Sequence, residues 1–281
     1  MSGPAGSAPA RATPLEPALL AAVAALAREA GEVVMAVYAH GQAHARTKSD
    51  ASPVTDADER AEALIVPALE RLLPGVPVVA EEAVAAGRTT AFAALPPERF
   101  WLVDPLDGTR EFLDRNGEFT VNIALVEHGR AVLGAVLAPA VGPGGVLYLG
   151  AEGLGAWCAH GQGPLQQIGA RRPPAEGWTI VSSRSHGDAA ALEAFLATHL
   201  RGQRIARHRT AGSSLKLCLL ACGQADLYPR LGRTMEWDIA AGHAVLAAAG
   251  GEVLTLAGSP LHYGKPGFEN PHFVARGAGS L

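Results

Sequence analysis

The stretch WLVDPLDGTREFL, residues 101–113, joins an apolar run to a turn that carries two aspartates. The apolar run predicts a buried strand, and the residues after the turn predict a short helix. Asp104 and Asp107 lie three residues apart where the strand ends, and Pro105 restricts the backbone between them. Because open α/β folds collect functional groups at strand ends, this stretch predicts both a sheet and a site.

The composition is that of a folded chain of enzyme size. Its 281 residues are 48% hydrophobic and 18% charged, enough for one large α/β domain or two packed smaller ones. The formal net charge of −4 and the lack of Lys and Arg runs interleaved with aromatic residues argue against a nucleic-acid polymer as partner. Cys218 and Cys222 are expected to be buried small apolar groups, so the sequence requires no oxidising compartment.

The first forty residues predict a tail followed by an amphipathic helix. Residues 1–14 are rich in Gly, Ala, Ser and Pro, which is typical of a disordered segment. Residues 15–41 predict a helix of the folded domain and not a signal peptide, because charged residues share one side of the pattern. No apolar segment reaches the roughly 18 residues of a membrane span, so we expect a cytoplasmic protein, with peripheral association at the inner face of the membrane left open. The apolar face comprises Leu19, Val23, Leu26, Ala30, Val33 and Val34.

Helix and strand signals alternate through the rest of the chain. Thr55 or Asp56 is a suitable N-cap for a helix that Pro74 and Gly75 end. Further along the first half we expect a short strand at 76–80, a loop at 83–99 and antiparallel hairpins over 119–150. In the second half we expect a strand at 178–186, a helix at 188–200, a helix from about Ser214, a strand at 225–230 and a helix from Asp238 that ends at Gly250 and Gly251.

This order predicts a layered α/β fold with a boundary between residues 150 and 175. We expect the tail at 1–14 to precede an N-terminal α+β half at 15–155 that binds metal. Residues 156–281 are expected to form a C-terminal α/β half that completes the active site.

Acidic residues recur at strand ends and helix starts. Mg²⁺ prefers oxygen ligands, and Asp104 and Asp107 offer two carboxylates with the Leu106 carbonyl between them. Gly108 would let the backbone approach a phosphate, and Thr109 opens a helix whose N–H groups favour an anion. The acidic residues with this placement are Glu81, Asp104, Asp107 and Asp238, with Asp56 as a fifth candidate.

Each of these features also has a purely structural interpretation. Asp-Pro-x-Asp-Gly could be a turn, and Asp238 could be a helix cap. An EF-hand is excluded, because the twelfth residue from Asp104 is Arg115 and not Glu. The acidic residues occurring together predict an α/β protein that handles phosphate and depends on Mg²⁺.

The longer motifs identify a family resemblance. DPLDGT preceded by AEE, with EWDIAAGHAVLAAAGG far downstream, resembles the inositol monophosphatase superfamily of Mg²⁺-dependent, lithium-sensitive phosphatases. WLVDPLDGTREFLDRNGEFTVNIALVEHG, SSRSH and GSSLKLCLLACGQADLYPR resemble the 3'(2'),5'-bisphosphate nucleotidases within it. The resemblance covers roughly residues 20–275 and implies that family's α+β fold, with alternating α/β/α/β/α layers. One departure is Ala80-Glu81-Glu82-Ala83, where many members have Gly-Glu-Glu-Ser, but the first Glu is kept.

The resemblance implies a role for each acidic residue. Glu81, Asp104 and the Leu106 carbonyl would hold one Mg²⁺, and Asp104, Asp107 and Asp238 would hold a second. Two ions are expected, with a third left open.

The resemblance also implies the catalytic and substrate-binding residues. Glu81, with Thr109, would position and deprotonate the attacking water, and Asp56 would support a further water. His186, Ser213, Lys216 and Arg230 match positions that contact the nucleotide and its second phosphate. The expected substrate contacts are Glu81, Leu106, Asp107, Gly108, Thr109, His186, Ser213, Lys216, Arg230 and Asp238.

The implied reaction is hydrolysis of 3'-phosphoadenosine 5'-phosphate to AMP and phosphate by a monomer or homodimer. One alternative is an inositol or sugar monophosphatase with the same metal core. Another is a non-catalytic regulator that binds nucleotide or metal.

Overall fold

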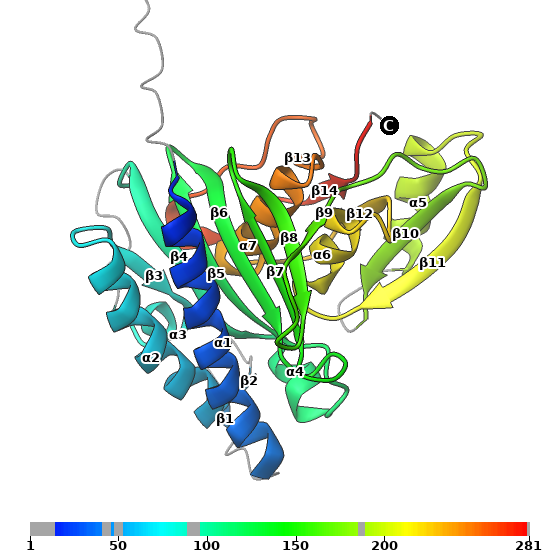
Figure 1. The fold of residues 1–281 in the computed structure, drawn as a ribbon. Coiled ribbons are helices and arrows are strands. Elements are labelled where there is room, and N and C mark those ends of the chain that lie inside the picture. Colours follow the sequence, from blue (N-terminus) through cyan, green and yellow to red (C-terminus); the bar gives the residue numbers. More distant parts are fainter. Residues whose placement is uncertain (1–14, 41–45, 48–52, 89–95, 185–188, 280–281) are drawn as a thin grey trace, which may run out of the picture.

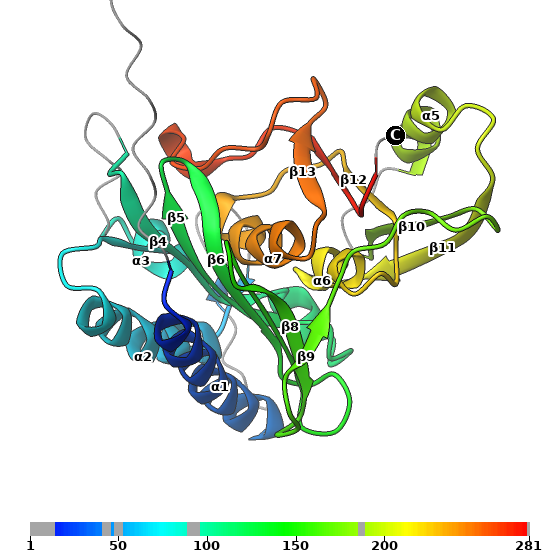
Figure 2. The same ribbon diagram turned by 45° about the horizontal axis from the view of Figure 1, so that its top comes forward.

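The chain folds into five layers that alternate helices and sheets (Figures 1 and 2). The computed structural model describes residues 15–40, 46–47, 53–88, 96–184 and 189–279. The outer helices α1 (Pro17–His40) and α2 (Asp56–Leu72) cover a seven-stranded sheet, whose other face packs on α6 (Leu215–Ala221) and α7 (Glu236–Ala248). These two helices pack in turn on a five-stranded sheet, whose far face α5 (Ala189–His199) covers. The expected α/β/α/β/α layering is therefore confirmed.

The two sheets differ in how their strands follow the chain. The seven-stranded sheet has the order β3-β4-β5-β6-β7-β8-β9, and every neighbouring pair after β3–β4 is antiparallel. The five-stranded sheet has the order β11-β10-β12-β14-β13. The strands of the first sheet are β3 (Val78–Ala80), β4 (Arg99–Asp107), β5 (Thr120–Glu127), β6 (Arg130–Ala138), β7 (Val146–Ala151), β8 (Gly155–His160) and β9 (Gln166–Ile168). Those of the second are β10 (Trp178–Ser183), β11 (Ile205–Ala211), β12 (Leu227–Arg230), β13 (Glu252–Thr255) and β14 (Phe273–Arg276).

Short elements complete the fold. A two-stranded ribbon of β1 (Arg46–Thr47) and β2 (Pro53–Val54) precedes α2. The short helices α3 (Glu81–Ala85) and α4 (Thr109–Leu113) follow β3 and β4 directly, and a 3₁₀ turn (Pro266–Phe268) precedes β14.

The helix α2 begins as its sequence predicts. The Thr55 hydroxyl accepts a hydrogen bond from the backbone N–H of Ala57, and the Asp58 carboxylate accepts one from the backbone N–H of Thr55. This capping box satisfies N–H groups that the first helical turn leaves without partners. Thr55 is therefore the N-cap, and Asp56 is the first helical residue.

Three predictions of secondary structure differ from the structure. The expected loop at 83–99 overlaps α3, which at five residues is too short to show a helical period. The last helix begins at Glu236 and not at Asp238 as expected. Asp238 is its third residue, and its carboxylate accepts a hydrogen bond from the backbone N–H of Met235. No element was predicted for 205–211, where β11 forms the sheet edge and its exposed arginines hide the strand pattern.

Other expectations of the sequence can be compared with the described residues. The antiparallel hairpins of 119–150 form as β5, β6 and β7, and α7 ends where Gly250 has a positive φ of 90°. Cys218 is buried and Cys222 half-buried, both as free thiols. Within the described residues no helix has the length and apolar character needed to cross a membrane. The predicted tail at 1–14 lies outside the described residues.

The helix α7 lies close against the first sheet because glycines face it. A Cβ on Gly134 of β6 would lie 2.2 Å from the carbonyl oxygen of Ala241, and one on Gly150 of β7 would lie 2.5 Å from the Cα of Val245. These separations are far below van der Waals contact, so larger residues would push the helix away from the sheet. The glycines therefore fix the position of the helix that carries Asp238.

We predict that Gly134→Ala lowers the free energy of unfolding by about 1–3 kcal/mol, because the added methyl group displaces α7. Gly169→Ala is the matched control, since its Cβ would meet its nearest neighbour, the Ala249 carbonyl oxygen, at 4.0 Å. Chemical denaturation followed by circular dichroism measures both. Equal stability of the two variants would contradict this account of α7.

Candidate active site

A bulge in β4 turns Asp104 and Asp107 toward the same side of the sheet. Residues three apart on a regular strand point to opposite faces. Here Asp104 pairs with Asn122 and Asp107 pairs with Thr120. An advance of three residues along β4 therefore matches an advance of two residues along β5. Leu106, in the bulge, packs into the core beneath α1 and α2. Both carboxylates therefore belong to the face that packs on α7.

Three carboxylates from separate elements meet at this face. Glu81 is the first residue of α3, Asp104 lies in β4, and Asp238 lies in the first turn of α7. One oxygen of each lies within 4.8 Å of the others. The cluster joins the end of one strand pair to the start of a helix that arrives more than 130 residues later in the chain.

The electrostatics of these carboxylates suit a divalent cation. Burial, partly offset by Lys216 and increased by the nearby Glu81 carboxylate, raises the pKa of Asp107 to about 6. Burial, followed by the charges of Asp107 and Glu81, raises the pKa of Asp238 well above its usual value. Like charges this close and this buried destabilise one another unless a cation offsets them. Hard oxygen donors with no nitrogen or sulfur ligand fit Mg²⁺.

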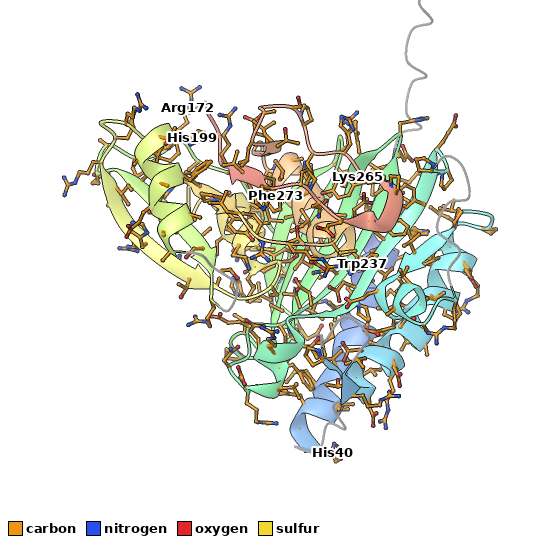
Figure 3. All side chains as sticks on the ribbon, turned by 180° about the vertical axis from the view of Figure 1, so that it is seen from behind. His40, Arg172, His199, Trp237, Lys265 and Phe273 are labelled. Atoms are coloured by element: carbon orange, nitrogen blue, oxygen red, sulfur yellow. The ribbon has the colours of Figure 1, made fainter. Side chains whose placement is uncertain are left out.

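A cavity of about 400 Å³ opens beside the cluster and gathers most of the predicted site. Asp107 borders this cavity, although it is not among the three residues of the tight cluster. Trp237, near the centre of the view in Figure 3, lines it and packs on Phe268 with ring centroids 5.7 Å apart. The predicted residues that line the cavity are Glu81, Asp107, Gly108, Thr109, Ser213, Lys216, Arg230 and Asp238.

The cavity is also lined by two cationic residues, Lys216 and Arg230. Lys216 is buried, and its Nζ donates hydrogen bonds to the carbonyl oxygens of Ala211 and Ser213. Burial lowers the pKa of Lys216 to about 8, against the opposing effect of Asp107. Arg230 lies at the end of β12 and donates to the carbonyl oxygen of Arg233 at 2.7 Å. One cavity thus has an acidic side and a basic side.

The turn before α6 is held in an uncommon conformation. Ser213 has a φ of 42°, and its Oγ is buried with no hydrogen-bond partner among the described residues. The backbone N–H of Gly212 donates to the Glu118 carboxylate at 2.8 Å, and Arg184 pairs with the same carboxylate. A Cβ on Gly212 would lie 2.5 Å from the Glu118 carbonyl oxygen, so glycine is required. Strain of this kind is common where a backbone presents groups to a ligand.

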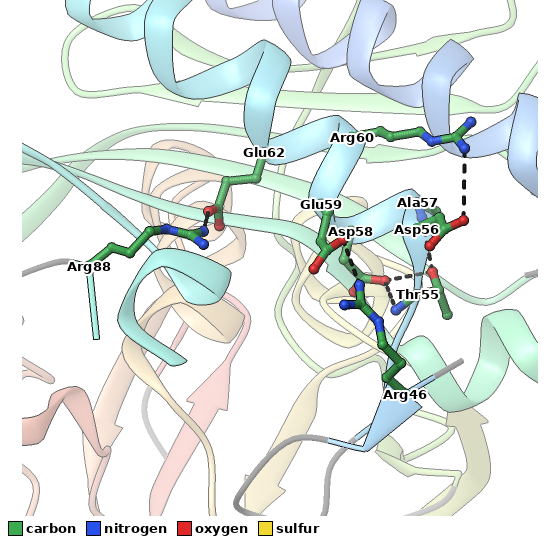
Figure 4. Close-up of polar contacts among 9 residues, drawn as sticks. All are labelled: Arg46, Thr55, Asp56, Ala57, Asp58, Glu59, Arg60, Glu62 and Arg88. Carbon is green, nitrogen blue, oxygen red and sulfur yellow. Dashed lines mark hydrogen bonds and ion pairs between the residues drawn. The ribbon is translucent and has the colours of Figure 1, made fainter. Parts of the chain in front are cut away.

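The acid beside Thr109 is Asp58, two residues after Asp56. The expected role of Asp56 in supporting a water stays a prediction. The Thr109 hydroxyl lies 3.4 Å from Asp58 Oδ1 and 3.3 Å from the Leu106 carbonyl oxygen. Asp58 is buried, whereas Asp56 is half-buried and faces Arg60 at 3.8 Å (Figure 4). Neither of the two lines the cavity. A sequence signal existed, because the acidic residues 58 and 62 share the helix face that carries Ala57 and Ala61.

Glu62 is a second residue that the sequence analysis missed. Its carboxylate accepts a hydrogen bond of 2.8 Å from the backbone N–H of Glu82 and pairs with Arg88 (Figure 4). Burial raises the pKa of Glu62. By holding the first turn of α3, Glu62 fixes the position of Glu81, the first residue of that helix.

His186 lies outside the described residues. Its predicted contact with nucleotide stays a prediction.

The fold and the cavity define a class of protein that binds a cation and an anionic substrate between two sheets. The family model described as "Inositol monophosphatase family" matches residues 15–276, so the chain belongs to the inositol monophosphatase family. This family is metal-dependent, typically with Mg²⁺.

Individual relatives lie within this family. The 3'(2'),5'-bisphosphate nucleotidase CysQ of Escherichia coli strain K12 is 47% identical over 91% of this chain and 98% of that protein. CysQ of Shigella flexneri is 46% identical over the same shares of the two chains. Among solved structures, CysQ from Bacteroides thetaiotaomicron is 35% identical with a TM-score of 0.74, covering 92% of this chain and 98% of that one. An inositol monophosphatase from Thermotoga maritima is 25% identical with a TM-score of 0.70, covering 92% and 91%.

We predict that Asp58→Asn slows hydrolysis of a phosphate ester by roughly 10- to 100-fold, because Thr109 loses its charged partner. Asp56→Asn is the matched control two residues away, and its rate should stay within about twofold of wild type. Initial rates of phosphate release at saturating Mg²⁺ measure both. Thermal unfolding of Asp58→Asn measures how much stability is lost with the cap on α2, so that this effect can be separated from the effect on turnover. Slower turnover in the Asp56 variant alone would favour Asp56 over Asp58.

Proposed function

We propose that this protein is a 3'(2'),5'-bisphosphate nucleotidase that hydrolyses 3'-phosphoadenosine 5'-phosphate to AMP and phosphate. The observation that carries this proposal is the two-sided cavity, in which Lys216 and Arg230 face the same space as the acidic residues. An acidic, metal-binding side suits the phosphate that reacts, and a basic side suits a second phosphate that does not. The printed names of the relatives from Escherichia coli and Shigella flexneri support the same activity.

The acidic residues would hold two Mg²⁺ ions, with a third left open. Glu81, Asp104, Asp107, Asp238 and the Leu106 carbonyl are the oxygen donors that this chain supplies. When bound, the ions neutralise phosphate charge and lower the pKa of water.

The residues around the reacting phosphate have separate tasks. Gly108 has a positive φ of 91°, which glycine adopts at little cost, and Gly108, Thr109 and Arg110 at the start of α4 line the cavity. Their backbone N–H groups donate to phosphate oxygens. The single Thr109 hydroxyl hydrogen has two acceptors within reach, Asp58 Oδ1 and the Leu106 carbonyl oxygen. With its hydrogen directed to one of them, the hydroxyl oxygen can accept a hydrogen bond from the attacking water and orient it.

The reaction needs no covalent nucleophile. Glu81 would accept a proton from the water as the water oxygen bonds to phosphorus. The bond from phosphorus to the 3'-oxygen breaks in the same step, and the 3'-oxygen takes up a proton from a solvent water. Lys216 and Arg230 bind the 5'-phosphate and hold the nucleotide in line. Catalysis then consists of positioning and charge stabilisation.

The second candidate is an inositol or sugar monophosphatase. The matched family favours it, because the acidic cluster alone would serve a substrate with one phosphate. The basic residues Lys216 and Arg230 oppose it, since both line the cavity and a substrate with one phosphate at the acidic side would leave them unused. A non-catalytic regulator is opposed by the presence of Thr109 beside the complete acidic cluster.

The test is phosphate release by the purified protein from 3'-phosphoadenosine 5'-phosphate, inositol 1-phosphate and fructose 1,6-bisphosphate. We expect a strong preference for the nucleotide. We also expect chelator or Li⁺ to abolish the release of phosphate from it. Lys216→Met should raise KM for the nucleotide by roughly 10- to 100-fold, because a charged hydrogen bond to the second phosphate is lost. The same variant should leave inositol 1-phosphate turnover nearly unchanged, which controls for general damage. Preference for a monophosphate, or equal effects of Lys216→Met on both substrates, would contradict the proposal.

A further inference from the structure

Asn122 lies at the centre of the acidic site without lining the cavity. It is fully buried on β5, opposite Asp104 in the ladder. Its Nδ2 donates to Asp107 Oδ2 at 3.3 Å and to Ser214 Oγ at 3.1 Å. The Ser214 hydroxyl in turn donates to the backbone carbonyl oxygen of Asp238 at 2.6 Å.

The direction of these hydrogen bonds is fixed by counting hydrogens. Ser214 has one hydroxyl hydrogen, and the carbonyl of Asp238 can only accept it. Ser214 must therefore accept from Asn122, so the amide nitrogen and not the oxygen points toward it. The second hydrogen of the same nitrogen is then directed to the Asp107 carboxylate. The reversed amide would bring its oxygen against two acceptors.

The three hydrogen bonds connect two acidic residues that lie on separate elements far apart in the sequence. They run from Asp107 on β4 through Asn122 on β5 to Ser214 before α6, and end at Asp238 on α7. Ser214 occupies the N-cap position of α6, yet its side chain does not cap that helix. Its hydroxyl instead holds the first turn of α7.

The side chain also carries a cost that a structural role does not explain. The Oδ1 atom of Asn122 is buried and has no hydrogen-bond partner among the described residues. A buried acceptor left without a donor destabilises the fold by about 1–3 kcal/mol, and leucine of similar volume would avoid it. The two hydrogen bonds that Nδ2 donates, to Asp107 and to Ser214, explain why this position carries an amide.

We propose that Asn122 is a positioning residue, whose Nδ2 group holds Asp107 and, through Ser214, the start of α7 in the relative placement that binds the cation. Partners of metal-binding carboxylates typically change metal affinity or activity by roughly 10- to 100-fold when removed. The inference extends the proposed function, but its first readout is Mg²⁺ binding and not turnover.

The experiment compares Asn122→Leu with Thr120→Val. Thr120 is the matched control, because it is equally buried on the same face of β5 and its hydroxyl has no partner among the described residues. Calorimetric titration with Mg²⁺ alone should show affinity roughly 10- to 100-fold weaker in Asn122→Leu and unchanged in Thr120→Val. In turnover assays kcat should fall, while KM for 3'-phosphoadenosine 5'-phosphate should stay within about threefold, since the basic wall is intact.

Ser214→Ala breaks the same connection at its other end and serves if Asn122→Leu does not fold. Because both changes interrupt one chain of bonds, the double variant should bind Mg²⁺ no more weakly than the worse single variant. Thermal unfolding in chelator separates a loss of stability from a loss of metal affinity.

Two results would overturn the role of Asn122. One is wild-type Mg²⁺ affinity and turnover in Asn122→Leu, and the other is an equal loss in Thr120→Val. A wild-type protein that binds Mg²⁺ but hydrolyses none of the phosphate esters would contradict the proposed function instead. In that case the titrations alone still decide whether Asn122 positions the acidic residues.

Discussion

Repulsion among closely spaced, largely enclosed carboxylates is the constraint on which the rest of this structure depends. Glu81, Asp104 and Asp238 are held within 4.8 Å of one another, and Asp107 borders the same space. Such a cluster does not assemble by itself, because each charge raises the free energy of the others. The backbone must hold it, and a bound cation must offset it. The bulge in β4, the capped start of α2 and the close approach of α7 to the first sheet all serve this placement.

The two sides of the cavity explain how one fold can distinguish two phosphates. The acidic side is built from the first sheet and the start of α7, and the basic side from the second sheet and α6. Glu118 links these parts, because it bonds both Arg184 after β10 and Gly212 before α6. A substrate with phosphates at two positions would engage both sides at once. This arrangement relates the five-layer fold directly to the choice of substrate.

The sequence could single out the acidic residues because their signals are local. Each lies where an apolar run meets a turn or a helix start. Glu81, Asp107 and Asp238 line the cavity, and Asp104 joins the cluster with Glu81 and Asp238. The sequence could not separate Asp58 from Asp56, because that choice depends on which face of α2 packs inward. Asn122 gave no local signal within an apolar strand, since its partners lie 15 and 92 residues away. Patterns within elements thus predicted the alternation of helices and strands, and the family resemblance implied the five layers. The residues that were missed depend on contacts between elements.

The central claim is that the three-carboxylate cluster exists to hold a divalent cation during phosphate hydrolysis. The most direct test is diffraction from crystals soaked in Mn²⁺, recorded at the manganese absorption edge. We predict an anomalous peak in contact with the carboxylates of Glu81, Asp104 and Asp238. A protein that hydrolyses 3'-phosphoadenosine 5'-phosphate with Mn²⁺, but shows no peak at this cluster, would contradict the account.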